Sequence, residues 1–379
     1  MVMNTNLLIV AGEPSGDRHA AHLVEELKKR LPQVNFYGIG GDEMAASGVQ
    51  LIYHIRDMAF LGLTEVIRHL PFIRSVFKRL QKWLNESQPA AVILIDYPGF
   101  NLRLARMAKQ RHIPVIYFIC PQLWAWGKHR IKKIRRFVDL PLVIFKFEEE
   151  FYARYGITAK FVGHPLVDEI KISLDEETFR TRHQLHSEKP IIALLPGSRS
   201  HELHQLLPLM AQAAQNFDGN GQYQWVVGKS ATLPINIFQA LLRDFPFIKI
   251  VEHDTHHLQK FAWLALVASG TATLETAYLG TPMIVLYKVS PLTYWIGRLL
   301  VNIPNIALVN IVLQRRIVPE LLQKEVTASR IEQEVRKYTV EPQYYQKVAA
   351  ELQKVPSILG EAGAAARAAD EIVKFLSKN

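Results

Sequence analysis

The chain has 379 residues and carries 45 Lys and Arg against 35 Asp and Glu, a formal charge of +10. Its composition, 49% apolar and 21% charged, is that of a globular protein and excludes a disordered or collagen-like chain. The single cysteine excludes a disulfide framework and a cysteine-ligated zinc site, and no apolar run reaches the roughly 18 residues of a membrane-spanning helix.

The first half of the chain alternates between apolar runs and amphipathic segments. Strands are predicted by the runs at 7–11, 91–95, 115–119, 140–145 and, more briefly, 161–163. Each run is apolar throughout, which is typical of parallel strands whose two faces are both covered by helices.

The alternation restarts after a charged segment, 164–189, that has no strand pattern. Further strands are predicted at 191–195, 225–227, 248–251, 264–268 and 283–286, and helices at 201–217 and 335–378. We therefore predict an α/β protein with two doubly wound domains and a cleft between them. The predicted bounds are 1–168, 185–350 and a helical extension over 351–379.

The positive charge is concentrated in one part of the sequence. Between Asp96 and Asp139 there is no acidic residue, while ten Lys and Arg occur there, which equals the net charge of the whole chain. Localised charge of one sign indicates an anionic partner, such as nucleic acid, a membrane surface or a phosphorylated substrate. A solvated basic face is the alternative.

Three predicted strand ends in the first half carry polar residues. After the first strand comes a turn, GEPSGD, whose candidate ligand-binding residues are Glu13, Ser15, Gly16 and Asp17. Asp96 follows the strand 91–95 and is a candidate general base, or else a helix cap. After the strand 115–119 come Gln122 and Trp124, which suit sugar stacking, a lipid interface or core packing.

Two predicted strand ends in the second half are rich in small residues. The candidate residues after 191–195 are Gly197, Ser198 and Arg199; those after 264–268 are Gly270, Thr271 and Glu275. Both loops open a helix, whose free N–H groups suit a phosphate, and no Walker lysine follows. Glu275 is placed to accept hydrogen bonds from a ribose diol. The pair of loops favours a nucleotide diphosphate in the second domain.

The window 66–85 has no acidic residue and an apolar stripe that includes Phe72 and Phe77. A basic amphipathic helix of this kind binds a membrane interface or a lipid, or simply faces the core. A histidine cluster, His253, His256 and His257, lacks the ligand pattern of a metal site, and we expect a solvated loop there.

Together these motifs resemble those of the lipid-A-disaccharide synthases. They are AGEPSGD at 11–17, DYPGFN at 96–101, PQLWAW at 121–126, GHP at 163–165, LPGSR at 195–199, SGTATLE at 269–275 and PELLQ at 319–323, in the family's order. The resemblance implies a GT-B-type fold and a metal-independent inverting glycosyltransferase without a cofactor. Such an enzyme joins UDP-2,3-diacylglucosamine to 2,3-diacylglucosamine 1-phosphate and releases UDP.

The resemblance also implies roles for individual residues. Asp96 matches the family's essential aspartate, and Glu13 and Asp17 would order the acceptor. Asn310 occupies the family's asparagine position near UDP, although Val309 and Leu313-Gln314 depart from the usual flanking residues. The implied partners are the two lipid substrates and an anionic membrane. The implied location is cytoplasmic, peripheral on the inner face of the inner membrane. A homodimer is left open.

Two alternatives remain from the residues alone. One is another UDP-sugar enzyme of the same architecture, either a UDP-N-acetylglucosamine epimerase or a polyprenyl-linked N-acetylglucosaminyltransferase. The other is a basic RNA-binding protein, against which the chain shows no recognisable RNA module and no exposed aromatic pattern of an RNA-recognition sheet. No nucleic-acid partner is therefore expected.

Overall fold

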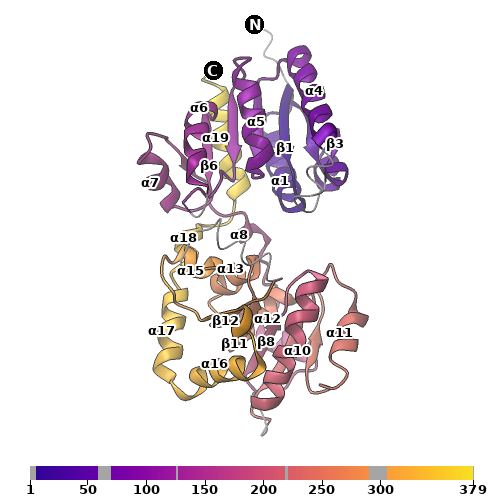
Figure 1. The fold of residues 1–379 in the computed structure, drawn as a ribbon, viewed down its shortest axis with the longest axis vertical. Coiled ribbons are helices and arrows are strands. Elements are labelled where there is room, and N and C mark those ends of the chain that lie inside the picture. Colours follow the sequence, from indigo (N-terminus) through magenta and orange to yellow (C-terminus); the bar gives the residue numbers. More distant parts are fainter. Residues whose placement is uncertain (1–5, 59–69, 125–126, 218–220, 290–304, 379) are drawn as a thin grey trace. The chain divides into compact units, whose positions relative to one another are not determined.

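The computed structural model describes residues 6–58, 70–124, 127–217, 221–289 and 305–378. It comprises two compact units. The N-terminal unit is Met1–Asp168 with Leu359–Asn379, and the C-terminal unit is Glu169–Ile358 (Figure 1). Each unit is built on a parallel sheet with helices on both faces, as the apolar strand pattern predicts.

The N-terminal unit contains a seven-stranded sheet in the order β3-β2-β1-β4-β5-β6-β7. The strands are β1 Asn6–Ala11, β2 Asn35–Gly40, β3 Gln50–His54, β4 Ala91–Ile95, β5 Val115–Phe118, β6 Leu140–Val143 and β7 Lys160–Phe161. The central strands β1, β4, β5 and β6 are almost wholly buried, which is why their residues are apolar or aromatic at every position after Asn6.

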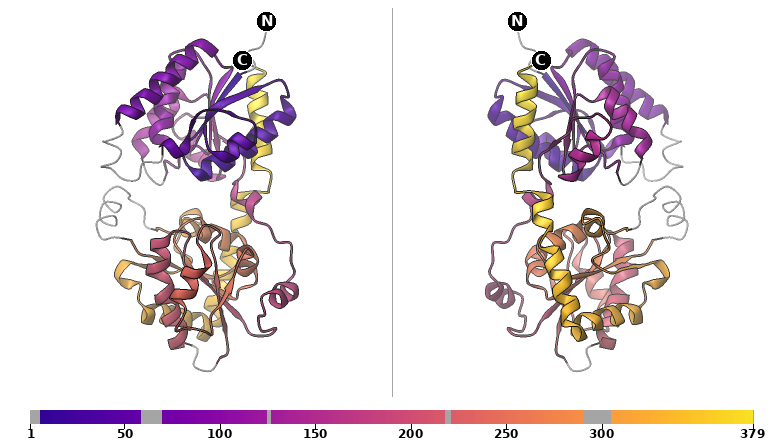
Figure 2. Two further views of the ribbon diagram at one scale, coloured as in Figure 1. Left: turned by 90° about the vertical axis from the view of Figure 1, so that its right-hand side faces the viewer. Right: turned by 90° about the vertical axis from the view of Figure 1, so that its left-hand side faces the viewer.

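Helices cover both faces of this sheet (Figure 2). One face packs against the apolar sides of α4 Leu70–Ser87, α5 Pro98–Lys109 and α6 Ile131–Phe137. On the other face α1 Pro14–Arg30 lies beside α19 Ala364–Leu376. The shorter helices of the unit are α2 Asp42–Ala46, α7 Phe147–Ala153 and α8 Leu166–Glu169, with η1 Ile55–Met58 and η2 Lys128–Arg130.

The C-terminal unit contains a six-stranded sheet in the order β10-β9-β8-β11-β12-β13. The strands are β8 Ile191–Leu195, β9 Gln224–Gly228, β10 Lys249–Val251, β11 Leu264–Ala268, β12 Met283–Tyr287 and β13 Glu320–Leu322. Its helices are α9 Glu176–Arg182, α10 Ser200–Phe217, α11 Ile235–Leu241, α12 Thr255–Phe261, α13 Thr271–Tyr278, α15 Leu308–Val312, α16 Ala328–Val340, α17 Pro342–Leu352 and α18 Val355–Leu359, with η3 Gln323–Glu325.

The C-terminal segment, predicted as one extension over 351–379, divides between the two units. Almost all of helix α18 belongs to the C-terminal unit, whereas α19 belongs to the N-terminal one. Helix α19 buries Ala364, Ala368, Ala369 and Ile372, and the three small alanines permit close packing on α1. Arg30 of α1 donates from Nε to Asp370 of α19 at 2.6 Å.

Three strands are missing from the prediction. In β2 the run is interrupted by Gly38 and Gly40, which removes the apolar signal. The edge strand β3 is only half-buried, and β13 has just three residues. Continuous apolar runs were the signal used, so the glycine-containing β2, the half-buried β3 and the very short β13 were not predicted.

Candidate functional site

In each unit the strand order reverses at the first strand of the sheet. β1 lies between β2 and β4, and β8 lies between β9 and β11. At such a switch point the loops that follow the two adjacent strands run to opposite faces, which opens a ligand site at the carboxyl ends. The residues that follow β1, β4, β8 and β11 are those selected from the sequence.

Asp96 lies at the switch point of the N-terminal unit. It directly follows β4, and because Ala11 pairs with Ile95, the turn after β1 lies alongside. The residue is open to solvent. The protein around its carboxyl group nevertheless removes enough water to raise the pKa of Asp96 to about 6, and the Glu13 carboxylate adds to the rise. Such a group is ionised at neutral pH and still basic enough to accept a proton.

The turn after β1 fits closely against the residue that follows Asp96. A Cβ atom at Gly12 would overlap the ring of Tyr97, so only glycine allows this approach. Glu13 and Ser15 are exposed on this turn, whereas Gly16 is buried against Ala11. Glu13 and Ser15 are thus the accessible members of the predicted set.

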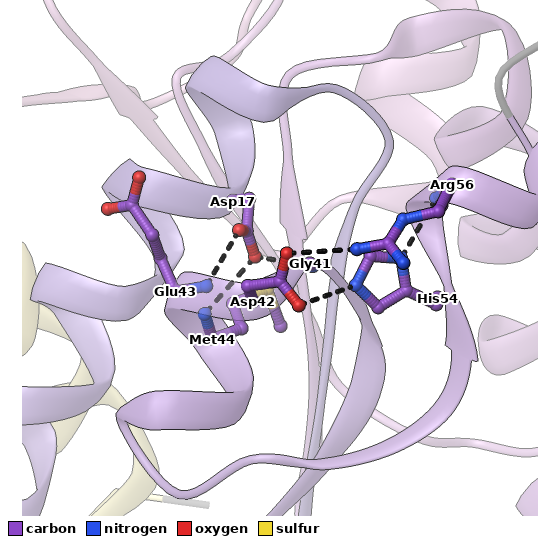
Figure 3. Close-up of polar contacts among 7 residues, drawn as sticks. All are labelled: Asp17, Gly41, Asp42, Glu43, Met44, His54 and Arg56. Atoms are coloured by element: carbon purple, nitrogen blue, oxygen red, sulfur yellow. Dashed lines mark hydrogen bonds and ion pairs between the residues drawn. The ribbon is translucent and has the colours of Figure 1, made fainter.

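Asp17, unlike the exposed Glu13, is buried, and Figure 3 shows its contacts with the start of α2. It is 4% exposed, and its two carboxylate oxygens accept backbone N–H groups of Gly41 (2.5 Å), Glu43 (3.1 Å) and Met44 (3.2 Å). These are the N–H groups at the start of α2, which would otherwise lack partners. Asp17 therefore anchors α2 to α1, and its oxygens are already engaged.

The loop after β5 is fixed by a buried carboxylate. Trp124 donates its indole N–H to Glu148 at 2.8 Å, and the second oxygen of Glu148 accepts the N–H groups of Ile144 and Phe145. Burial raises the pKa of Glu148 to about 7. Trp124 is half-buried, as is Gln122. Trp126 lies outside the described residues.

Phe72 and Phe77 of α4 are half-buried and face the core. The ring of Phe72 meets Tyr53 edge-on at 6.0 Å, and that of Phe77 stacks on Phe100 at 4.5 Å. These contacts give both rings a packing role. The start of the predicted window, residues 66–69, lies outside the described residues.

Most predicted nucleotide-binding residues share one pocket of about 330 Å³ in the C-terminal unit. It is lined by Gly197, Ser198, Arg199, Gly270, Thr271 and Glu275. The pairing of Leu195 with Val267 brings the ends of β8 and β11 together, so the two small-residue loops form one site. Gly197 has φ +105°, a conformation that glycine alone adopts readily.

The chemistry of this pocket suits an anion next to a diol. Helices α10 and α13 both begin at it, and their first-turn N–H groups favour negative charge. The Arg199 side chain is 74% exposed, with a long 3.4 Å contact to Glu202. Burial raises the pKa of Glu275, while a hydrogen bond from Gln259 (3.2 Å) opposes the rise.

Asn310 does not line this pocket. It is fully buried, its Nδ2 donates to Val318 O (2.9 Å) and to Glu320 Oε1 (2.7 Å), and its Oδ1 accepts from Ile317 N and Val318 N. These bonds tie α15 to β13. The structure thus gives Asn310 a role in holding the fold of this segment.

Sequence reasoning missed two residues of α12. Gln259 lines the pocket and orients Glu275. It was missed because it belongs to α12, where the sequence shows no recognisable binding motif. His257, expected in a solvated loop, is buried, and its Nε2 accepts the N–H groups of Ser173 (2.9 Å) and Leu174 (3.0 Å). In the described part of the chain, no three His, Cys, Asp or Glu side chains gather as a metal cluster.

The basic stretch forms exposed surface on α5, η2 and α6. Lys109 pairs with Asp139 at 2.7 Å. The exposed cations are Arg103, Arg106, Lys128, Lys132, Lys133, Arg135 and Arg136. No helix in the described ranges is long and apolar enough to cross a bilayer.

Comparison with known proteins gives one family. The model of the lipid-A-disaccharide synthetase family matches residues 7–371. A lipid-A-disaccharide synthase of Syntrophus aciditrophicus is 43% identical over 100% of both chains. That of Myxococcus xanthus is 39% identical over 98% of this chain and 97% of its own.

Solved structures share the fold at low identity. The UDP-GlcNAc 2-epimerase of Neisseria meningitidis bound to UDP-GlcNAc has a TM-score of 0.62 at 14% identity, over 99% of this chain and 100% of its own. The calicheamicin glycosyltransferase CalG4 has a TM-score of 0.62 at 17% identity, over 99% and 98%. Both comparisons support the predicted two-domain glycosyltransferase architecture.

Proposed function

The chain belongs to the lipid-A-disaccharide synthase family, and from this premise we propose the reaction and the residues that carry it out. The enzyme is a hexosyltransferase that forms the lipid A disaccharide. The proposed donor is UDP-2,3-diacylglucosamine, the acceptor is 2,3-diacylglucosamine 1-phosphate, and the products are the disaccharide 1-phosphate and UDP.

The donor nucleotide is bound by the C-terminal unit. The observation that carries this proposal is the pocket in which Gly197, Ser198 and Arg199 face Gly270 and Thr271. The N-termini of α10 and α13 and the Arg199 guanidinium supply positive charge to a diphosphate. Glu275, oriented by Gln259, accepts hydrogen bonds from the ribose hydroxyls.

The chemical step is a single displacement with Asp96 as the general base. The Asp96 carboxylate accepts the proton of the acceptor 6-hydroxyl while that oxygen forms a bond to the anomeric carbon of the donor. The bond from that carbon to the diphosphate breaks, and UDP leaves with the electron pair, which inverts the anomeric configuration. Arg199 and the start of α13 stabilise the charge that develops on the diphosphate.

The acceptor is ordered by exposed and half-buried residues of the N-terminal unit. Glu13 and Ser15 on the turn after β1 are accessible beside Asp96, and Gln122 and Trp124 follow β5. Asp17 supports this turn indirectly by fixing α2. Phe72 and Phe77, because they pack on the core, are not assigned to the acyl chains.

Mass spectrometry of the products tests the reaction. UDP-diacylglucosamine incubated with the monosaccharide phosphate is expected to give the disaccharide 1-phosphate and an equal amount of UDP. Without the acceptor no conversion is expected. Epimerisation leaves the mass of the donor unchanged and is therefore followed by proton NMR of the same incubation. An inverted donor sugar would favour an epimerase, a function that several structural neighbours have but that identities of 13–14% do not transfer.

A peripheral association with an anionic membrane would supply both lipids. The exposed cations of α5, η2 and α6 support it, since each basic residue near an anionic surface contributes about 1 kcal/mol. In vesicle flotation, Lys132→Glu with Lys133→Glu should weaken binding to phosphatidylglycerol vesicles. Lys324→Glu with Lys347→Glu, the same charge change on exposed residues of the other unit, should not. Equal flotation of both variants and the wild type would remove this surface from the proposal.

A further inference from the structure

The turn that carries Asp96 has an unfavourable backbone conformation. Asp96 has φ +41° and Tyr97 has φ +47°, so two consecutive residues with side chains occupy the left-handed region. A Cβ atom makes this region unfavourable, and most residues found there are glycine. Strain of this kind persists only where the surroundings impose it, and it is concentrated at functional sites.

Two buried side chains hold the backbone of Asp96 and Tyr97 in this left-handed conformation. Asn101 of α5 donates from Nδ2 to the carbonyl oxygens of both Ile95 (3.0 Å) and Asp96 (2.8 Å). Tyr117 of β5 donates its hydroxyl to the same Asp96 oxygen at 2.6 Å. The register brings Tyr117 there, because it pairs with Leu94, two residues before Asp96. The Asp96 carbonyl is thus held from the following helix and from the neighbouring strand.

Burying the polar groups of Asn101 and Tyr117 costs folding free energy, so a role in stability alone does not explain them. Asn101 and Tyr117 are both fully buried among apolar residues. Within the described residues, the Oδ1 atom of Asn101 has no hydrogen-bond donor. A buried acceptor without a donor is unfavourable, and an apolar residue of similar size would avoid that penalty. What the two side chains provide is the position of one peptide group.

We propose that Asn101 and Tyr117 are positioning residues for Asp96. Their hydrogen bonds to the Ile95 and Asp96 carbonyl oxygens keep the backbone in the left-handed turn. This backbone conformation determines the position of the Asp96 carboxylate. The proposal rests on the role of Asp96 as general base. The proposal requires no contact between a substrate and the side chain of Asn101 or Tyr117.

Tyr117→Phe tests the proposal because it removes only one hydroxyl. We expect kcat to fall about tenfold, since small misplacements of a reacting group slow catalysis strongly. The KM for the UDP-sugar should stay within about twofold, because the nucleotide is bound by the other unit. A freed Asp96 gains hydration, so the acid limb of the kcat profile should move below pH 6. The titratable groups around this turn are Glu13, Tyr97 and Tyr117: the Glu13 carboxylate adds to the raised pKa of both Asp96 and Tyr97, and the Asp96 carboxylate adds to that of Tyr117.

The matched control is Tyr338→Phe. Its hydroxyl is also buried and also donates to a backbone carbonyl, that of Met283 at 3.2 Å, in the C-terminal unit. It should lower the melting temperature like Tyr117→Phe and leave kcat and the pH profile unchanged. Hydrogen exchange of the peptide around Asp96 gives a readout apart from activity: faster exchange is expected in Tyr117→Phe and in Asn101→Ala only.

Three outcomes are decisive. If Tyr117→Phe and Asn101→Ala fold and keep the kcat, acid limb and exchange rates of the wild type, the positioning role is refuted. The same holds if Tyr338→Phe lowers kcat as much as Tyr117→Phe does. If instead Asp96→Asn keeps full turnover, the base assignment in the proposed function fails, and that result is independent of Tyr117.

Discussion

The two switch points have the same topology and opposite chemistry. In the N-terminal unit, the loops after β1 and β4 present carboxylates, those of Glu13 and Asp96, and Asp96 stands on a strained turn. In the C-terminal unit, the loops after β8 and β11 present small residues, two helix N-termini and Arg199. One site suits proton transfer and the other suits an anion.

The difference indicates how two units with the same topology can serve different steps of a group transfer, one suited to proton transfer and the other to anion binding. A parallel sheet supplies a position at its carboxyl edge, and the residues that follow each strand decide the chemistry. Small residues let a phosphate approach the backbone N–H groups at a helix start. A carboxylate that loses hydration and lies near a second carboxylate has a raised pKa and can act as a base. The comparison predicts that variants in the two units separate kcat from nucleotide binding.

The largest effect is expected for Asp96→Asn. Loss of the proposed general base should lower kcat about 1,000-fold, while UDP affinity measured by calorimetry stays unchanged because the proposed UDP site is in the other unit. The folded site disfavours the ionised carboxylate, as the raised pKa shows, so the neutral amide should not lower stability at neutral pH. Turnover within a fewfold of the wild type would mean that Asp96 is not the base.

Arg199→Ala, a substitution in the C-terminal unit, should have the next largest effect. Without the guanidinium, kcat/KM should fall about 100-fold and UDP affinity should weaken, because the charge on the leaving diphosphate loses a partner. Arg330→Ala, which removes an arginine whose side chain is 47% exposed on α16, is the matched control and should change neither. Equal losses in both variants would indicate a general charge effect instead of a local one.

The sequence was informative about loops that follow buried central strands. Apolar runs marked β1, β4, β8 and β11, and the residues after them formed the two sites because parallel strands end at a common edge. It was uninformative where a residue's partners lie far along the chain. Asp17 and Glu13 look alike in a turn, but Asp17 is engaged by residues of α2.

The same limit applies to Asn310 and to Tyr117. Asn310 matches a family position, yet its hydrogen bonds go to the segment that precedes β13. Tyr117 was indistinguishable from its apolar neighbours within a strand, because its hydroxyl partner is the backbone of another strand end. Spacing in a sequence cannot reveal which polar atom a buried side chain meets.

Asp17→Asn sharpens the comparison within the N-terminal unit, since it should affect stability and not chemistry. Replacing an oxygen that accepts backbone N–H groups by an NH₂ group should lower the free energy of unfolding by about 2 kcal/mol. Asp42→Asn is the control, because Asp42 is exposed and its pairs with His54 and Arg56 contribute little, about 0.5 kcal/mol. Denaturant unfolding of both variants measures the difference. Equal stabilities would show that Asp17 does not anchor α2.

The smallest effect is a shift in pH dependence on Glu13→Gln. Asp96 must be ionised to accept a proton, so kcat should fall as the pH drops through about 6. The Glu13 carboxylate contributes to the raised pKa of Asp96 but less than burial does. Removing its charge should therefore lower that pKa and move the acid limb to lower pH by less than one unit. Glu43→Gln, an exposed carboxylate of α2, should leave the limb in place. An unchanged or raised limb in Glu13→Gln would mean that the two carboxylates do not interact, and that the N-terminal switch point works through Asp96 alone.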